Sequence, residues 1–429
     1  MPNTRSVRNP PSPAAGQGPL MPLDEALALL RDQARPLLRT ESVHLLQADG
    51  RVLAEDIVAP LPVPPHDNAL RDGYAVRVAD VAMPNWLMPV SQRIAAGRAA
   101  QPLAAGSAAR VFTGAPVPRG ADAVVAQEDA QSMDDATAPQ VRILKCPQPG
   151  QGLRRAGEDV ALGARALARG SRLTPAGVGL AASMGLEHLK VAARPRVALF
   201  STGDELVMPG RMPPESLPPG AIFNSNHFFL HLLLGRMGCQ VTDFGTVPDR
   251  RNATLLALKS AAREHDLVLT SGGVSVGDED HIRACVQQLG QLNLWQIAIK
   301  PGKPFAFGQI RRTATESAHF IGLPGNPVSS FTAFLILVRP FLLGMQGAAQ
   351  TAAPAVSLRA DFSWEQPEER REFLRARRNA SGGVDLFENQ GAGVLSSMQW
   401  ADGLVDNPAG KAIARGDAVR FIALADLLA

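Results

Sequence analysis

The chain has 429 residues, 45% of them hydrophobic and 19% charged, which is the composition of a globular protein with roughly two to four domains. A formal net charge of +3 and an aromatic content of 5% argue against a nucleic-acid partner, which would require a strongly basic surface or aromatic stacking platforms. The three cysteines are scattered and have no C-x-x-C spacing, so we expect neither a disulfide framework nor a zinc site.

The N-terminal segment 1–19 is predicted to be a disordered tail. It is rich in proline and lacks the apolar stretch of a signal peptide. No run of 18 or more apolar residues occurs in the chain, so the sequence predicts no membrane span. We therefore expect a cytoplasmic protein.

Two separate segments, 20–60 and 146–194, have a mixed composition with signs of helices. Residues 23–30 have the apolar spacing of a helix, with acidic residues in the first turn that favour the helix dipole. In the second segment, Thr174 followed by proline is typical of a helix start.

An inserted β-rich domain is predicted over 61–145. Several prolines between 60 and 65 lead into it, and short apolar runs at 110–113 and 123–126 are separated by glycine and proline. Such runs between turn residues are typical of short strands.

The region 195–345 alternates between strands and helices, which predicts a three-layer α/β/α domain with a mostly parallel sheet. The expected strands are 197–200, 240–247, 266–270, 295–299 and 319–323. The expected helices are 225–237, 252–264, 279–289 and 327–343. Residues 346–429 consist of short strands and turn pairs, so we expect a small C-terminal β domain there. The fold class is thus a multidomain α/β protein.

A glycine-rich segment, 271–277, follows one expected strand and precedes a helix. Backbone amides near Gly272 and Gly273, together with the Ser275 hydroxyl, could converge on an anion at the helix N-terminus. A tight turn without a ligand is the more common use of such glycines, and the segment lacks the Gly-Lys-Ser/Thr of a Walker A loop.

A rigid turn, Lys-Pro-Gly-Lys-Pro, follows the strand expected at 295–299. It projects two ammonium groups, those of Lys300 and Lys303, from one short segment. Two like charges on a stiff turn favour an anionic ligand over solvated surface lysines.

A second proline-rich turn, Leu-Pro-Gly-Asn-Pro, follows the strand expected at 319–323. Asn326 suits a helix cap and Pro327 a first helical turn, which a structural role alone would explain. The free amides of the turn, with Pro324 and the Ser329 hydroxyl, also fit an oxyanion site. Ligands of such sheets bind beyond the carboxyl ends of the strands, where these turns lie.

Three carboxylates are expected at the same sheet edge: Glu205, Asp249 and Asp280. Carboxylates beside an anion site would repel the ligand unless a divalent cation lay between them, so Mg²⁺ is the expected cofactor. Surface charge and helix-terminal charge are the alternatives, and for the neighbours Asp278 and Glu279 we prefer the latter.

Taken in order, these segments resemble the MoeA family, whose fold also forms the C-terminal part of gephyrin. The resemblance extends over nearly the whole chain after residue 19. The matching runs begin at Asp72-Gly73-Tyr74, Phe112-Thr113-Gly114, Arg154, Ser201, Ser271, Ala298 and Gly322.

The resemblance implies an elongated homodimer of four-domain subunits. In each subunit, 20–60 and 146–194 would form one linker domain that carries the β-rich domain 61–145 as an insertion. The active site would lie at the dimer interface, between the α/β domain of one subunit and the inserted domain of the other. The implied reaction is that of a molybdopterin molybdenumtransferase: molybdate is inserted into adenylylated molybdopterin and AMP is released, with Mg²⁺ or a similar ion. Other proteins of molybdenum cofactor biosynthesis are possible partners.

The resemblance also implies site residues from each part of the chain. On their own, the turns of the inserted region would be read as ordinary loops. The implied residues are Asp72, Thr113, Arg154 and Asp159 from the insert side, Glu205, Asp249, Asp280, Lys300, Lys303, Pro324 and Pro327 from the α/β domain, and Arg370 from the C-terminal domain. Ala392 departs from the family pattern, because a serine is frequent there.

Two other functions remain as alternatives. The first is a molybdopterin adenylyltransferase-like enzyme that shares only the α/β domain, which the matches between Asp72 and Asp159 disfavour. The second is a scaffold like gephyrin, for which the sequence shows no added docking segment.

Overall fold

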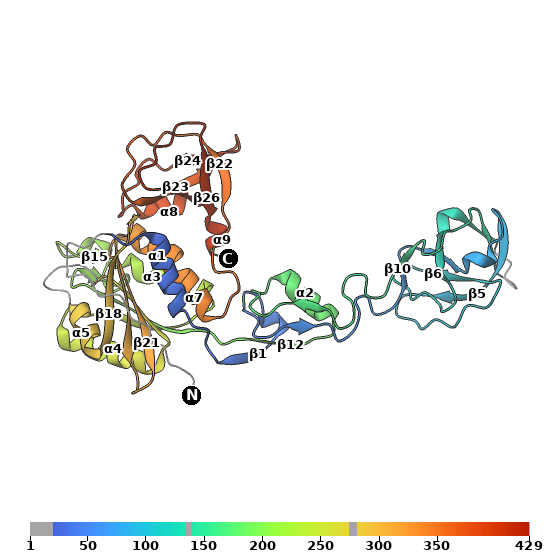
Figure 1. The fold of residues 1–429 in the computed structure, drawn as a ribbon, viewed down its shortest axis with the longest axis horizontal. Helices are drawn as coiled ribbons and strands as arrows, with labels where there is room; N and C mark the ends of the chain where they lie inside the picture. Colours follow the sequence, from blue (N-terminus) through green and yellow to red (C-terminus); the bar gives the residue numbers. More distant parts are fainter. Residues whose placement is uncertain (1–19, 134–138, 274–280, 429) are drawn as a thin grey trace, which may run out of the picture.

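The structure is a computed structural model that describes residues 20–133, 139–273 and 281–428. Figure 1 shows an elongated molecule in which the α/β domain and the C-terminal domain lie at one end and the inserted β domain at the other. The linker domain, with β1, β12 and α2, lies between them. The multidomain fold expected from the sequence is confirmed.

The α/β domain is built on a six-stranded sheet in the order β16-β13-β17-β21-β20-β18. The first four of these strands are parallel, whereas β20 is antiparallel to both of its neighbours. The strands are β13 (Arg196–Thr202), β16 (Gln240–Val247), β17 (Leu267–Ser271), β18 (Gly290–Gln296), β20 (Pro304–Arg311) and β21 (Ser317–Leu323).

The prediction of one continuous strand at 295–299 was wrong. The segment is divided, because β18 ends at Gln296 and Ile297 N donates instead to Lys303 O, at 2.8 Å, across the turn that leads into β20. The next strand, β19 (Ile299–Lys300), belongs to a different sheet. The antiparallel pair of β18 and β20 was not predicted at all.

Both faces of this sheet are covered by helices. Along β13, Val197 and Leu199 belong to one core, with α1, α3 and the helices after β21, whereas Ala198 and Phe200 belong to the other, with α4 and α5. Burial of each large apolar side chain stabilises the fold by about 1.5–3 kcal/mol. The helices are α1 (Leu23–Gln33), α3 (Ser225–Arg236), α4 (Arg251–Glu264), α5 (His281–Leu289), α6 (Pro327–Ala333), the π-helical η5 (Phe334–Val338) and α7 (Arg339–Met345).

One of these helices packs against a different domain from the one expected, and another is long and apolar. Helix α1, expected in the linker domain, packs instead against the α/β domain, since Leu23, Ala26 and Leu30 are buried in its core. The helical stretch Pro327–Met345 is long and apolar enough to cross a membrane, but 83% of its most apolar window is buried inside the protein, as in the core helix of a folded domain.

The linker domain has a small core between short antiparallel strand pairs and one helix. In this core, Leu53, Leu173, Met184 and Val191 are each at most 3% exposed. Its elements are β1 (Thr40–His44) paired with β12 (His188–Ala192), β2 (Ile57–Val58) paired with β11 (Arg165–Leu167), η1 (Leu45–Gln47) and α2 (Pro175–Ser183). The Thr174 side chain accepts from Gly177 N and caps α2, as predicted.

The inserted domain is a six-stranded sheet in the order β7-β4-β6-β5-β9-β8. Strand β10 (Leu153–Arg154) pairs with β3 (Asn68–Ala69) beside it. The sheet strands are β4 (Gly73–Val76), β5 (Trp86–Ile94), β6 (Ala108–Val111), β7 (Ala123–Ala126), β8 (Ala130–Met133) and β9 (Gln140–Ile143), and the 3-10 turns are η2 (Val78–Asp80) and η3 (Gln127–Asp129).

The C-terminal domain is a small barrel, because β23 and β25 pair and close the sheet. Strand β19 of the preceding domain pairs in parallel with β23, so the two domains share one sheet. The strands are β22 (Val356–Ala360), β23 (Arg371–Arg378), β24 (Gly383–Leu386), β25 (Gly403–Asn407) and β26 (Ala418–Ala423), and the helices are α8 (Leu395–Trp400) and α9 (Leu424–Leu428).

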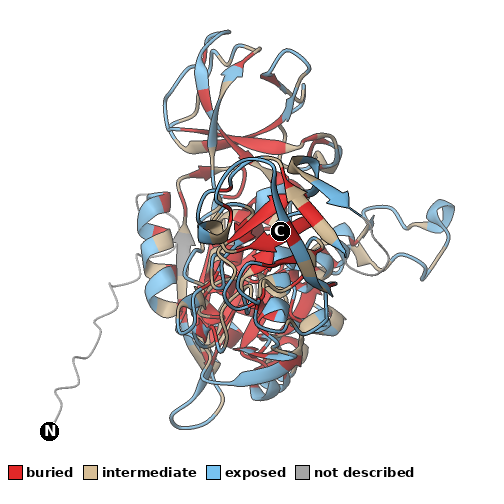
Figure 2. Ribbon diagram, turned by 90° about the vertical axis from the view of Figure 1, so that its right-hand side faces the viewer, coloured by how far each residue is buried: buried red, intermediate tan, exposed pale blue. Residues whose placement is uncertain are grey.

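Figure 2 shows that buried residues are concentrated in the sheets and that the loops and outer helix faces are exposed. The remaining short elements, β14 (Leu206–Val207), η4 (Pro214–Ser216) and β15 (Ile222–Phe223), form an excursion after β13.

Candidate functional site

The predicted binding turns meet at one edge of the α/β sheet. Strands β13, β16, β17 and β21 are parallel, so their carboxyl ends lie at the same edge. Because β20 is antiparallel to β21, its first residue, Pro304, lies at that edge too. The Lys-Pro-Gly-Lys-Pro turn, which directly precedes β20, is therefore next to the glycine-rich and Leu-Pro-Gly-Asn-Pro turns.

Asn226 on α3 joins two of these turns. Its Nδ2 donates to Ser271 Oγ at 2.9 Å and to Gly325 O at 2.7 Å, and the residue is 7% exposed. The Gly272 amide donates to Leu323 O at 3.0 Å, which aligns the same two strand ends. Sequence reasoning did not select Asn226, since an asparagine in the first turn of a helix carries no signal for a long-range contact.

The glycine-rich turn needs its glycines for two reasons. Gly272 and Gly273 have φ of 86° and 68°, in the left-handed region that favours glycine. A Cβ on Gly273 would also lie 2.8 Å from Thr202 Oγ1, at the end of the neighbouring strand β13. The ends of β13 and β17 can therefore lie this close together only if positions 272 and 273 carry no side chain. Ser275 and Asp280 lie outside the described residues, so their predicted roles have no structural counterpart here.

The lysine turn packs against the start of α6. Gly302 is buried, and a Cβ added to it would lie 3.2 Å from Ser329 O. Lys303 and Asn326 are exposed, whereas Ser329 is 4% exposed. The Asn326 side chain makes no capping hydrogen bond with α6. One exposed region therefore lies among the backbone amides of these turns, the Lys303 ammonium and the side-chain amide of Asn326.

Lys300 has a different environment from Lys303. Its Nζ lies 2.9 Å from Glu368 Oε1 and 3.6 Å from Glu372 Oε1, both in the C-terminal domain. Arg370, also predicted to bind substrate, donates from Nη2 to Glu368 Oε2 at 2.8 Å. Glu368 and Glu372 were not selected from the sequence. They belong to a run of mixed charges, 368–372, in which the sequence does not indicate the partner of each residue. The partners follow only from the pairing of β19 with β23.

A buried arginine lies near this cluster. Arg375 is 1% exposed, and its guanidinium donates to Ser397 Oγ, Phe373 O and Gly391 O at 3.1–3.3 Å. Burial lowers its pKa to about 10. The adjoining loop reaches the α/β domain, because Val328 N donates to Ala392 O at 2.9 Å. The C-terminal domain thus borders the oxyanion turns.

The acidic residues at the sheet edge are spread over two strand ends. The Glu205 carboxylate folds back toward Gly203, where an added Cβ would lie 2.5 Å from Oε2. Asp249 N donates to Asp204 Oδ1 at 3.2 Å, which brings the loops after β13 and β16 together. Among the described residues, no group of three histidine, cysteine or acidic side chains could hold a metal by itself.

A pocket of about 670 Å³ opens beside these loops. It is lined by residues of the excursion after β13 and of β16: Leu206, Val207, Met208, Pro209, Arg211, Asp243, Gly245 and Thr246. The Asp243 carboxylate is held there by His227 Nε2 at 2.9 Å and by the Gly245 amide at 2.6 Å.

The inserted domain, which carries Asp72 directly before β4 and Thr113 shortly after β6, lies at the end of the molecule opposite the α/β domain (Figure 1). Asp159 precedes Val160, which belongs to the core of the linker domain. The Thr113 amide and hydroxyl both donate to Asp72 Oδ1 at 2.8 Å, which lowers the pKa of Asp72. Arg154 and Asp159 are exposed. Asp72 and Thr113 are in contact with each other, but within one subunit they lie in a different domain from Lys303 and far from it.

Three family models match successive parts of the chain. They are described as MoeA N-terminal region (domain I and II), for residues 21–185, probable molybdopterin binding domain, for residues 198–344, and MoeA C-terminal region (domain IV), for residues 357–424.

Curated relatives match over most of their length. A protein from Haemophilus influenzae named molybdopterin molybdenumtransferase is 40% identical over 335 residues, which is 78% of this chain and 80% of that protein. Molybdopterin molybdenumtransferase 2 of Mycobacterium tuberculosis is 36% identical over 387 residues, which is 86% of this chain and 91% of that protein. A crystal structure of the molybdopterin biosynthesis moeA protein from Pyrococcus horikoshii has a TM-score of 0.80 and 29% identity, covering 94% of this chain and 100% of that one.

Proposed function

The chain belongs to the MoeA family, and from that premise we propose that it is a molybdopterin molybdenumtransferase of molybdenum cofactor biosynthesis. It would insert molybdate into adenylylated molybdopterin and release AMP. The observation that carries this proposal is the meeting of three turns with Lys303 and Arg370 at one sheet edge. Molybdate and the substrate phosphates are anionic, and lysines, arginines and free amides are the groups that bind them.

The chain's own residues have distinct tasks in this proposal. The amides after β17 and β21 hold oxyanions, and Lys303 neutralises their charge. Glu205 and Asp249, with Asp280 outside the described residues, would bind Mg²⁺. Mg²⁺ is commonly held by one or two carboxylates together with substrate phosphates, so the lack of a cluster of three such side chains among the described residues is compatible with this role. The bound ion would polarise the phosphoanhydride.

A homodimer would complete the site. Asp72 and Thr113 lie at the far end of the subunit, so they can meet the oxyanion turns only if they come from a second copy. Exposed apolar residues on the α/β domain, including Phe228 at 45% and Leu232 at 66% on one side of α3, offer a surface for such an assembly. We also propose a cytoplasmic location and contacts with other proteins of the same biosynthesis.

The two alternatives account for less of the chain. An adenylyltransferase-like enzyme would need only the α/β domain, whereas the family match extends over 21–185 and 357–424 as well. A scaffold would not need the paired Asp72 and Thr113, or cations at the sheet edge.

The test is release of AMP from adenylylated molybdopterin by the purified protein with molybdate and Mg²⁺. Lys303→Ala should lower the rate at least about tenfold, which corresponds to the loss of one charge-assisted contact in the transition state. The matched control is Lys259→Ala on the exposed side of α4, which should keep the wild-type rate. No AMP release by the wild-type protein, or an unchanged rate in Lys303→Ala, would contradict the proposal.

A further inference from the structure

One carboxylate bridges two cations on either side of the domain junction, Lys300 and Arg370, which the sequence predicted to bind the anionic substrate. Glu368 Oε1 lies 2.9 Å from Lys300 Nζ of the α/β domain, and its Oε2 lies 2.8 Å from Arg370 Nη2 of the C-terminal domain. Each oxygen of the Glu368 carboxylate therefore accepts from one cation. This is the way in which a tetrahedral oxyanion would bridge the same pair.

We infer that Glu368 is an internal competitor for the oxyanion, which must be displaced before a dianion can bind between Lys300 and Arg370. The inference rests on the proposed function and deepens it. It gives Glu368 a role in setting the affinity of the site for its anionic substrate, without a role in the chemical step.

The charges of the cluster support this role. Lys300 and Arg370 supply two positive charges, while Glu368 and Glu372 supply two negative charges, so the cluster is already neutral before any ligand arrives. A dianion added to a neutral cluster gains little attraction. Once the Glu368 carboxylate has moved away, the remaining charge is +1 and attracts the dianion.

The two glutamates differ in their freedom to move. Glu372 is completely buried, and its Oε2 accepts from Trp364 Nε1 at 2.8 Å and Asn407 Nδ2 at 3.3 Å. Glu368 lies in the loop before β23, and its side chain is 38% exposed. Rotation of its side chain into solvent breaks only the contacts with the two cations. Glu372 therefore stays as a fixed counter-charge that orients Lys300, and Glu368 is the group that can leave.

The protonation state of Glu368 keeps the competition active near neutral pH. Hydrogen bonds from Arg370 and Lys300 lower its pKa to about 2, so the carboxylate stays charged throughout the physiological range. Within the physiological pH range, the Glu368 carboxylate can therefore be displaced from the two cations by another anion but not by a change in pH.

The test is molybdate binding to the full-length protein, measured by isothermal titration calorimetry without the pterin substrate. Glu368→Gln should bind molybdate at least about tenfold more tightly than the wild type, because the neutral amide forms weaker hydrogen bonds with the two cations than the carboxylate does. Glu368→Asp, whose shorter side chain cannot reach both cations, should lie in between. The matched control is Glu369→Gln, an exposed neighbour in the same loop, which should bind as the wild type does.

Other outcomes separate this inference from the proposed function. If the wild type binds molybdate and Glu368→Gln binds it no more tightly, the competition does not exist and the proposed function still stands. A lower melting temperature in Glu368→Gln with unchanged affinity would assign Glu368 to domain contact alone and overturn the inference. If neither protein binds molybdate at millimolar concentration, the oxyanion site itself is wrong, and both proposals fail.

Discussion

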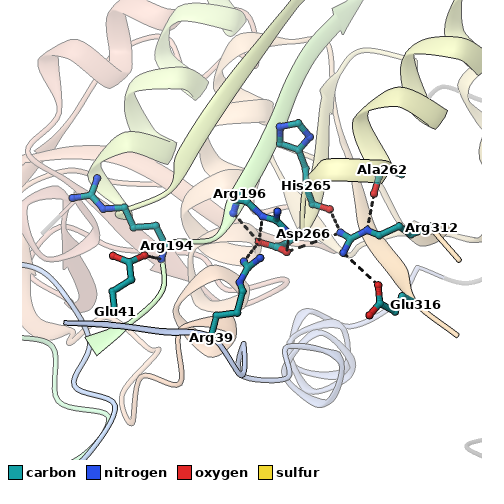
Figure 3. A network of polar contacts seen from close by, with 9 residues as sticks. All are labelled: Arg39, Glu41, Arg194, Arg196, Ala262, His265, Asp266, Arg312 and Glu316. Carbon is teal, nitrogen blue, oxygen red and sulfur yellow. Dashed lines mark hydrogen bonds and ion pairs between the residues drawn. The ribbon is translucent and has the colours of Figure 1, made fainter. Parts of the chain in front are cut away.

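Arg39 Nη2 lies 2.6 Å from Asp266 Oδ2, and this contact joins the linker segment before β1 to the residue that directly precedes β17 of the α/β sheet. Asp266 also accepts from Arg196 at 3.0 Å, and Arg312 lies 4.0 Å away (Figure 3). The carboxylate is 8% exposed. Burial alone would raise its pKa, but the hydrogen bonds from Arg196 and Arg39 outweigh burial and lower the pKa. This ion cluster fixes the direction in which the linker leaves the α/β domain.

Asp266→Asn should destabilise the α/β domain by about 1.5–3 kcal/mol, because the buried carboxylate is the acceptor of charge-assisted hydrogen bonds from the partly exposed Arg39 and Arg196. The measurement is the free energy of unfolding of this domain in urea. Glu316→Gln is the control, since the Glu316 side chain is 64% exposed and lies 3.9 Å from Arg312, and it should cost less than about 1 kcal/mol. Equal effects of the two substitutions would show that Asp266 is not the centre of the cluster.

His319 should make the protein sensitive to mild acid. Burial lowers its pKa to about 4 from the ordinary 6.5, with Asp266 opposing the shift. The unfolded chain therefore binds a proton first as the pH falls, so stability is lost between pH 6.5 and about 4, by at most about 3 kcal/mol.

His319→Phe should remove this part of the pH dependence. The aromatic ring can keep the packing with Phe307 and Phe341, whose ring centroids lie 5.9 and 5.0 Å from that of His319. Melting temperatures at pH 7 and pH 4.5 provide the measurement, and the exposed His188→Gln is the control. If the difference between the two pH values is as large in His319→Phe as in the wild type, His319 is not responsible.

Asn226→Ala should loosen the oxyanion turns. It removes two hydrogen bonds from a buried side chain and leaves Gly325 O and Ser271 Oγ without this donor, at a cost of about 1–3 kcal/mol. We expect a lower melting temperature together with weaker molybdate binding. Asn252→Ala, on the exposed side of α4, should change neither. Loss of stability with full molybdate affinity would mean that the turns keep their arrangement without Asn226.

The shared active site of the proposed dimer can be tested by complementation. Asp72→Asn and Lys303→Ala should each lower the rate at least about tenfold when present alone, because each removes a group from every site. In mixed dimers, one site carries both substitutions and the other carries none. Random mixing should therefore restore about one quarter of the wild-type sites. AMP release by the refolded or co-expressed mixture is the measurement. A mixture that contains heterodimers but releases AMP no faster than either variant alone would place Asp72 and Lys303 in the same subunit's site.

The sequence predicted the α/β domain well because its signals are local. The runs 197–200 and 266–270 are short, apolar and followed by turn residues, and they form β13 and β17. The expected helix starts at Thr174 and Pro327 were also found, because caps and first-turn prolines act within a few residues.

The contacts missed in the sequence depend on pairing between distant segments. Lys300 was predicted to be free for an anion, yet its nearest partner, Glu368, is 68 residues away and is reached only through the pairing of β19 with β23. Asn226 reaches Gly325 over 99 residues. Helix α1 has an apolar side that would suit either neighbouring domain, and only packing decides between them. No local pattern encodes these choices.

The shared sheet limits how freely this protein can exchange its parts. Ile299 and Lys300 already pair with Arg371 and Glu372, with a hydrogen bond from Arg371 N to Ala298 O at 2.9 Å, across the boundary that separates two of the matched family regions. Cutting the chain at that boundary would leave an unpaired strand edge on the α/β side and a lysine without its buried counter-ion. Recombination between homologues should therefore succeed only when both partners of this pairing are inherited together, and the exchangeable unit must join residues 195–428 with helix α1, whose Leu23, Ala26 and Leu30 complete the same core.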